Sequence, residues 1–341
     1  MVRDPEPALL PVDEPAPAGS PETSPLIPSP LDPKLFAPES IDAETAEFNR
    51  ELEAAIAAAP PITAFPPAAI RKAREEGRSI FGPVETVAAA RERGIPGPAG
   101  DLRLRVLVPD VVRGVYLHLH GGGWTLGAAK QSDLRNQAIA RHCGLAVVSV
   151  EYRLAPEHPF PAGPDDCEAA ALWLARSASA EFGTTRLWIG GESAGAHLAV
   201  VTMLRLRDRH GLRPFTGANL VYGAYDLSMT PSQRRWGERN LVLSTPILEW
   251  FADFFVPDRA RRRDPDVSPL YADLAGLPPA LITVGTLDPL LDDSLFLHAR
   301  WIAAGGRAEL AVWPGGIHGF DAFPTRLSRA ARARMDEFLG G

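Results

Sequence analysis

Ser193 lies in the pentapeptide G-E-S-A-G, a pattern typical of the nucleophilic serine of hydrolases. The apolar run before it predicts a strand, and the alanine-rich run after it predicts a helix. A serine at such a strand–turn–helix junction has a strained backbone, so the residues two positions to either side must be small. Gly191 and Gly195 meet this requirement. So short a pattern also arises by chance and does not identify a nucleophile on its own. The oxyanion donors, the base and the acid of such a site must therefore be found elsewhere in the chain.

The segment H-L-H-G-G-G-W follows another predicted strand and contains three consecutive glycines. Consecutive glycines let backbone N–H groups approach a substrate oxygen, as an oxyanion hole requires. We assign the N–H groups of Gly122, Gly123 and Ala194 to this role, with Gly121 and His120 supporting the loop. A phosphate-binding loop is the alternative, but neither G-x-G-x-x-G nor G-K-[ST] occurs here.

A base and an orienting acid are expected after the serine, in the order Ser, acid, His. His318 lies in W-P-G-G-I-H-G-F, a glycine-rich loop after the last predicted strand, where the base of such a site is expected. His197, one helical turn after the serine, is expected to be a packing residue. The sequence therefore favours His318 as the general base.

Asp288 is the favoured acid, because it directly follows a predicted strand and precedes a proline that suits the first position of a helix. Asp226 follows another predicted strand and is a competing candidate. Asp292 and Asp293 lie one turn further on and are expected to serve as charges at the start of that helix.

Strands and helices alternate along most of the chain, which predicts an α/β fold with a mainly parallel sheet covered by helices on both faces. The predicted strands span residues 101–109, 114–120, 145–152, 186–191, 217–225, 280–288 and 307–315. The predicted helices between and after them span residues 132–144, 163–178, 193–211, 289–306 and 326–340.

Two further segments are expected to form a helical cap over the carboxyl ends of the strands, where ligands bind in such folds. We predict a proline-rich N-terminal arm over 1–40, cap helices over 41–85 and a helical cap insertion over 227–264. The catalytic domain would comprise 86–226 and 265–341. Four side chains are candidates for the substrate pocket: Trp124, Glu192, Trp250 and Phe254. For the three aromatic ones, packing within the cap is an equal alternative.

The composition excludes several function classes. The formal net charge is -7 and the pI is about 5.7, so nothing favours nucleic-acid binding. The basic run at 259–263 is flanked by acids and is expected to be solvated. Cys143 and Cys167 have no metal-ligand spacing and are expected to be buried thiols. We expect no metal, no cofactor, no signal peptide and no membrane span, and hence a cytoplasmic protein.

Taken together, the motifs resemble those of the hormone-sensitive-lipase-like esterases, the bacterial family IV carboxylesterases of the α/β-hydrolase superfamily. The resemblance runs from about Gly114 to the C-terminus. It rests on six segments: HGGGW (120–124), EYRLAPEHPFPAGPDDC (151–167), GESAGAHLA (191–199), DPDVSPL (264–270), LPPALITVGTLDPLLDD (277–293) and GGIHGF (315–320).

This resemblance implies a triad of Ser193, Asp288 and His318, a cap, and hydrolysis of short to medium acyl esters without a metal. The chain departs from the family pattern at Glu192, where Asp or Thr is common, and at Ala196, where Gly is common. An amidase or arylacetamide deacetylase on the same triad is the alternative activity. A non-catalytic receptor on this fold would be expected to lack a triad member. Oligomeric state is left open, with a homodimer among the options.

Overall fold

The computed structural model describes residues 31–341, so residues 1–30 of the predicted arm lie outside the described part. The helices are α1 (Ala43–Ala57), α2 (Pro67–Glu75), α3 (Asp133–Cys143), α4 (Ala162–Phe182), α5 (Ala194–His210), α6 (Pro231–Trp236), α7 (Thr245–Phe255), α8 (Leu291–Ala303) and α9 (Arg326–Gly340). The strands are β1 (Arg91–Gly97), β2 (Gly100–Leu107), β3 (Gly114–Leu119), β4 (Leu145–Val150), β5 (Leu187–Glu192), β6 (Phe215–Val221), β7 (Ala280–Leu287) and β8 (Ala308–Ile317).

The strands form one sheet in the order β1-β2-β4-β3-β5-β6-β7-β8. The six strands from β4 to β8 in this order pair in parallel, while β2 pairs antiparallel with both β1 and β4. The predicted mainly parallel sheet is therefore confirmed. Strand β1 was not predicted, because its sequence RERGIPG contains two glycines and a proline and exposes most of its side chains. Such residues are tolerated at the edge of a sheet.

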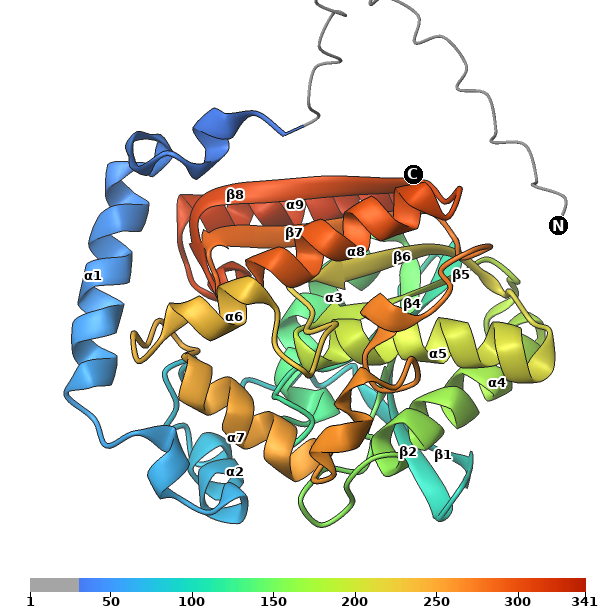
Figure 1. The fold of residues 1–341 in the computed structure, drawn as a ribbon. Coiled ribbons are helices and arrows are strands. Elements are labelled where there is room, and N and C mark those ends of the chain that lie inside the picture. The colour runs from blue at the N-terminus through green and yellow to red at the C-terminus, as the bar shows by residue number, and fades with distance from the viewer. Residues whose placement is uncertain (1–30) are drawn as a thin grey trace, which may run out of the picture. The chain divides into compact units, whose positions relative to one another are not determined.

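Successive side chains of the central strands enter different hydrophobic clusters, which explains why helices cover both faces. Leu117 of β3 packs in the cluster that contains α4, α5 and α8 residues, whereas its neighbour Tyr116 packs with residues of α3 and α9. Figure 1 shows α5 and α8 in front of the sheet and α3 and α9 behind it. The continuous apolar runs of β3 and β4 thus reflect burial on two sides.

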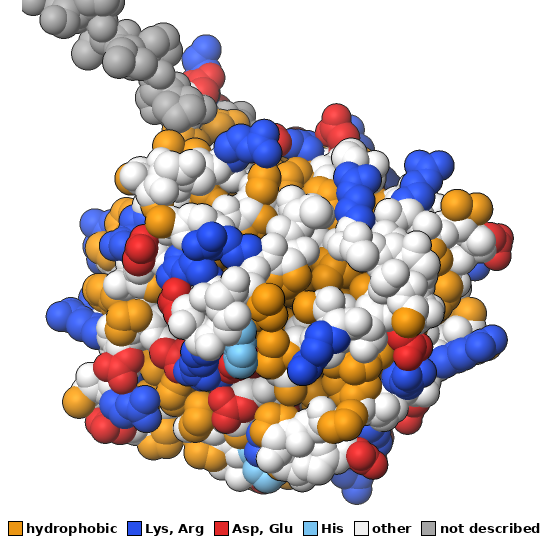
Figure 2. All heavy atoms as spheres, turned by 90° about the vertical axis from the view of Figure 1, so that its right-hand side faces the viewer, with side chains coloured by type: hydrophobic (Ala, Val, Ile, Leu, Met, Phe, Trp, Pro, Cys, Tyr) orange, Lys and Arg blue, Asp and Glu red, His pale blue; other side chains and the backbone are white. Residues whose placement is uncertain are grey.

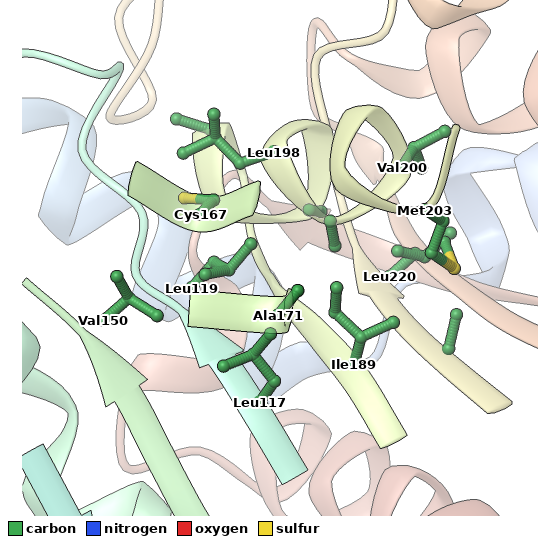
Figure 3. Packing of buried hydrophobic residues seen from close by; sticks show 14 of the residues in the cluster. Leu117, Leu119, Val150, Cys167, Ala171, Ile189, Leu198, Val200, Met203 and Leu220 are labelled. Atoms are coloured by element: carbon green, nitrogen blue, oxygen red, sulfur yellow. The ribbon is translucent and has the colours of Figure 1, made fainter. Parts of the chain in front are cut away.

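The core beneath the serine turn consists of small and branched side chains from several elements. Figure 3 shows Leu117 and Leu119 of β3 beside Cys167 and Ala171 of α4, with Leu198 of α5 above them. All five side chains are buried. Cys143 is buried as well, so the expectation of two buried thiols is confirmed.

Some of the segments predicted to form a cap contact the predicted catalytic domain, and others contact one another. Helix α1 contacts β8 and α9, and α6 contacts α8, so both lie against the catalytic domain. Helix α7 contacts the 3-10 turn Ile62–Ala64, which precedes α2 (Figure 1). The division into catalytic and cap domains stays a prediction.

The basic run over Arg259–Arg263 forms a 3-10 turn, and the expectation that it is solvated is confirmed for its exposed residues but wrong for Arg262. Arg262 is buried, because its guanidinium pairs with Asp253 and donates to the carbonyl oxygen of Val256 at 3.2 Å. On the face drawn in Figure 2, basic and acidic side chains are interspersed with apolar ones.

Arg205 of α5 links the helix behind Ser193 to two other segments. Its guanidinium donates to both carboxylate oxygens of Asp266 at 2.6 and 2.8 Å. It also donates to Asp165 at 2.8 Å and Glu168 at 3.2 Å, both in α4. Because Arg205 is buried, its loss would leave several carboxylates without their cation.

We expect Arg205→Met to lower the free energy of unfolding by about 2 kcal/mol, below the full value for a buried pair because Asp266 keeps contact with water. Urea denaturation followed by circular dichroism measures this. Arg50→Met is the matched control, because the exposed Arg50–Glu47 pair should contribute less than about 0.5 kcal/mol. Equal effects of the two substitutions would contradict the assigned structural role.

Candidate active site

Ser193 lies at a sharp turn between β5 and α5, with φ 54° and ψ −119°. Positive φ is uncommon for a residue with a side chain, so the surrounding packing must maintain it. The Ser193 N–H donates to the carbonyl oxygen of Val221 at 2.8 Å. A Cβ added at Gly195 would lie 1.8 Å from the Leu119 carbonyl oxygen, and one at Gly191 would lie 2.0 Å from it. The turn therefore requires glycine at both positions, as the sequence predicted.

A continuous chain of hydrogen bonds joins the three residues predicted to form the triad. His318 Nε2 lies 2.9 Å from Ser193 Oγ, and His318 Nδ1 lies 2.9 Å from Asp288 Oδ2. The other Asp288 oxygen accepts the Leu290 N–H at 2.9 Å. Asp288 and His318 are buried, while Ser193 is partly accessible. The loops after β5, β7 and β8 bring the three together.

The competing acids lie elsewhere. Asp226 accepts hydrogen bonds from the backbone and hydroxyl of Ser228 and from the Tyr271 hydroxyl. Asp293, expected to be a charge at a helix start, is fully buried in the structure. Its carboxylate accepts four hydrogen bonds from residues 225–233, the segment that runs from the end of β6 into α6, and burial raises its pKa to about 7. Asp293 thus holds that segment in place.

The glycine loop lies beside the serine turn, since a Cβ added at Gly121 would be 3.6 Å from the Ser193 Cβ. Gly122 has φ 122°, and a Cβ added there would lie 2.2 Å from the Leu126 carbonyl oxygen. Within residues 31–341, the N–H groups of Gly122 and Gly123 donate to no protein acceptor. Ala194 is the first residue of α5, where helical N–H groups also lack intrahelical partners. These three N–H groups therefore remain available for a substrate oxygen.

His120 supports this loop. Its ring stacks on Tyr152 at 4.1 Å between centroids, and its Nδ1 lies 2.9 Å from the Gly121 carbonyl oxygen. The Tyr152 hydroxyl donates to the His120 carbonyl oxygen at 2.7 Å. Burial lowers the pKa of His120 to about 4, so the ring is neutral at neutral pH.

Comparison with known proteins places the chain among hydrolases. Residues 116–322 match a family described as having the alpha/beta hydrolase fold. Carboxylesterase NlhH of Mycobacterium tuberculosis is 35% identical over 80% of this chain and 89% of NlhH. Carboxylic ester hydrolase LipN of the same organism is 36% identical over 66% of this chain, and the match spans 62% of LipN. A solved esterase from the archaeon Pyrobaculum calidifontis has a TM-score of 0.78 and 30% identity, covering 86% of this chain and 97% of that structure.

The chain belongs to the α/β-hydrolase family. Its relatives place it in the hormone-sensitive-lipase-like branch, as the sequence motifs indicated. No helix among residues 31–341 is long and apolar enough to cross a membrane. In the same residues, no cluster of three or more His, Cys, Asp or Glu side chains is arranged to bind a metal ion.

Glu192, the residue that departs from the family pattern, pairs with a buried histidine. Its carboxylate lies 3.1 Å from His118 Nε2, and His118 Nδ1 lies 2.8 Å from the Ser149 hydroxyl. Burial opposes the charge of Glu192, but the facing His118 together with Arg135 and His120 holds the pKa of Glu192 below its ordinary value. The sequence did not predict this partner, although His118 stands two positions before the glycine loop.

A cavity of about 1660 Å³ opens at Ser193 and His318. Of the four predicted pocket residues, Trp124 and Glu192 line it, whereas Trp250 and Phe254 do not. Trp250 and Phe254 instead pack on each other at 4.8 Å between ring centroids, the alternative considered for them. Sequence reasoning missed most of the apolar lining, because helical spacing alone does not tell which face of a helix meets the cavity. This lining includes Ile56, Ile62, Phe65, Ile70, Phe81, Ile247, Leu248, Phe251 and Leu290.

Trp124 contributes to the core as well as to the cavity. Its indole stacks on Phe255 at 4.6 Å, and its Nε1 donates to His197 Nδ1 at 3.0 Å. His197 Nε2 lies 2.7 Å from the Val267 carbonyl oxygen. His197 therefore packs, as expected, and also connects the glycine loop to the segment before β7.

We expect Gly195→Ala to lower the free energy of unfolding by about 3 kcal/mol, because the new methyl group would overlap the Leu119 carbonyl oxygen. Thermal and urea denaturation measure this. Gly94→Ala in β1 is the control, because a Cβ there meets nothing within 4 Å. A Gly195→Ala protein as stable as the wild type would contradict the close packing of this turn.

Proposed function

We propose that this protein is a serine carboxylesterase that hydrolyses short to medium acyl esters through an acyl-enzyme intermediate. The observation that carries the proposal is the hydrogen-bonded chain from Ser193 through His318 to Asp288, which opens into the cavity. The class of reaction is supported by the relatives named carboxylesterase and carboxylic ester hydrolase.

In the first half of the reaction, Ser193 Oγ attacks the ester carbonyl carbon and passes its proton to His318 Nε2. Asp288 holds the imidazole through Nδ1 and stabilises its protonated form. The developing oxyanion accepts hydrogen bonds from the N–H groups of Gly122, Gly123 and Ala194. Loss of one such donor raises the barrier by roughly 3 kcal/mol.

The tetrahedral intermediate then collapses. His318 Nε2 gives its proton to the departing alkoxide, the carbon–oxygen bond of the alcohol breaks, and the acyl group remains on Ser193. In the second half, a water molecule gives a proton to His318 and attacks the acyl carbon. Release of the carboxylic acid returns the proton to Ser193 Oγ.

We expect Ser193→Ala to abolish hydrolysis of 4-nitrophenyl butyrate and covalent labelling by a fluorophosphonate, because it removes the hydroxyl that His318 Nε2 contacts. Asp288→Asn should lower kcat by about 10⁴, because the imidazole loses the carboxylate that orients it. Release of 4-nitrophenolate and mass spectrometry of the labelled protein measure these effects.

Asp226→Asn is the matched control for the acid, because Asp226 also follows a strand but bonds to Ser228 and Tyr271. It should retain kcat within about threefold of wild type, as expected for a site outside the chemistry. Substantial turnover by Ser193→Ala, or a larger loss from Asp226→Asn than from Asp288→Asn, would overturn the assignment.

Phe251 of α7 lies on the glycine loop, since a Cβ added at Gly123 would come within 2.3 Å of its ring. We expect Phe251→Ala to raise kcat/KM for 4-nitrophenyl octanoate relative to the butyrate by about fivefold, because the cavity gains room beside the reacting carbonyl. Phe254→Ala is the control, as that side chain lies outside the cavity lining. An unchanged ratio in Phe251→Ala would show that this ring does not limit acyl length.

A further inference from the structure

Arg74, near the end of α2, is a cation without an anionic partner in the cavity that contains Ser193. Within residues 31–341 its guanidinium forms no hydrogen bond and no ion pair. Its contact is with the Phe81 ring, whose centroid lies 5.8 Å from the guanidinium carbon. This contact leaves the N–H donors of the guanidinium without acceptors. A ring face attracts a positive charge but does not replace a hydrogen-bond acceptor.

The other cations of this segment are paired, so Arg74 differs from its neighbours. Arg71 pairs with Glu157, and Arg78 pairs with Glu76. Lys72 lies 4.0 Å from Glu76. Of these four cations, Lys72, Arg74 and Arg78 line the cavity, and among these three only Arg74 is half-buried and unpaired.

Arg74 lines the same cavity as Ser193, His318 and the glycine loop. Its partner Phe81 lies against the residue after the catalytic base, since a Cβ added at Gly319 would be 3.3 Å from the Phe81 ring. The Phe81 ring also stacks on Phe323 at 5.4 Å. Through the Phe81 ring, Arg74 is therefore packed next to the segment that follows His318.

The carboxylates in the cavity lining do not neutralise this charge. Glu192 faces His118, Asp321 accepts from the Tyr222 hydroxyl, and Asp336 pairs with Arg135. Glu76 pairs with Arg78, and Glu85 is exposed. Arg332, from α9, adds a second guanidinium whose buried Nε has no hydrogen-bond partner in the described chain. Among the described lining residues, the buried and half-buried carboxylates therefore have partners of their own, and none of these partners is Arg74.

An unpaired guanidinium in a cleft is unfavourable, because burial removes its hydration without a compensating anion. Burial accordingly lowers the pKa of Arg74 to about 10, which leaves it protonated at neutral pH. A purely apolar substrate would remove still more water from it. A carboxylate would instead form charge-assisted hydrogen bonds, and the planar guanidinium fork matches its geometry.

We propose that the preferred substrates are esters that also carry an anionic group, a carboxylate on the acyl or the alcohol part, which Arg74 binds. This inference rests on the proposed esterase function and names its substrate class. Three observations carry the inference: the unpaired guanidinium, its place in the lining of the cavity that contains Ser193 and His318, and the partners that the buried and half-buried carboxylates of that lining already have.

The test compares three chromogenic esters at equal ionic strength. The neutral reference is 4-nitrophenyl butyrate, mono-4-nitrophenyl glutarate carries the charge on the acyl part, and 3-carboxy-4-nitrophenyl butyrate carries it on the alcohol. For at least one charged ester, Arg74→Met should lower the ratio of kcat/KM for the charged ester to kcat/KM for the neutral one by about tenfold, mainly through KM. The charged ester whose ratio falls identifies the side that binds Arg74.

Arg78→Gln is the matched control, because it removes one positive charge from the same segment and the same cavity lining, at an exposed residue that already pairs with Glu76. Its ratio should stay within about twofold of wild type, as expected for a screened surface charge. Arg74→Lys should recover part of the preference, because it restores the charge without the fork. Equal changes in the ratio for Arg74→Met and Arg78→Gln, or none in either, would overturn the inference.

A binding measurement separates this inference from the proposed function. Titration calorimetry of the Ser193→Ala protein with monoethyl glutarate and with diethyl glutarate requires no turnover. The same titrations with 4-acetoxybutanoate and its methyl ester place the charge on the alcohol part. Tighter binding of either charged ester, lost on adding Arg74→Met, supports the anion site even if no ester is hydrolysed. Equal binding of the charged and neutral members of both pairs would overturn it, while hydrolysis of 4-nitrophenyl butyrate by wild type would still support the esterase.

Discussion

The backbone of Ser193 is held at a positive φ, and the rest of the site depends on that turn. A residue with a side chain in this conformation costs on the order of 1–3 kcal/mol, so tightly packed surroundings must maintain it. The carbonyl end of β3 lies directly against Gly191 and Gly195, with no space for a methyl group at either. This close approach lets α5 begin immediately after the serine. It also brings the helix N-terminus and the glycine loop to the same point.

The polar groups around the turn are connected by hydrogen bonds that continue away from the reacting atoms. Glu192 and His118 lie behind the serine, and His120 and Tyr152 lie behind the glycine loop. Asp293 holds the segment after β6, which leads into the helices near the cavity. Arg205 holds α5 itself. Each of these groups is buried or half-buried and has its partners in other elements, so the site is part of the folded core.

The cavity combines two environments that serve different parts of a substrate. Apolar side chains of α7, such as Phe251, lie against the glycine loop where a reacting carbonyl would be placed. The charged groups lie along α2 and α9, with Arg74 beside Phe81. The distribution fits an acyl or alcohol chain with a polar end better than a uniformly apolar substrate. Specificity would then depend on the segments that line the cavity around the serine turn.

The sequence by itself determined the alternation that leads to the fold, the serine turn, the glycine loop and the order of the acid and base. These features depend on local rules: apolar periodicity, small residues at a strained turn, and loops after strands. Tertiary structure decided between Asp288 and Asp226, because both follow strands and only contact with His318 separates them. It also decided the partner of Glu192, the face of α7 that meets the cavity, and the pairing of the β1 edge strand. Each of these depends on residues distant in the chain, and local pattern carries no information on which distant groups meet.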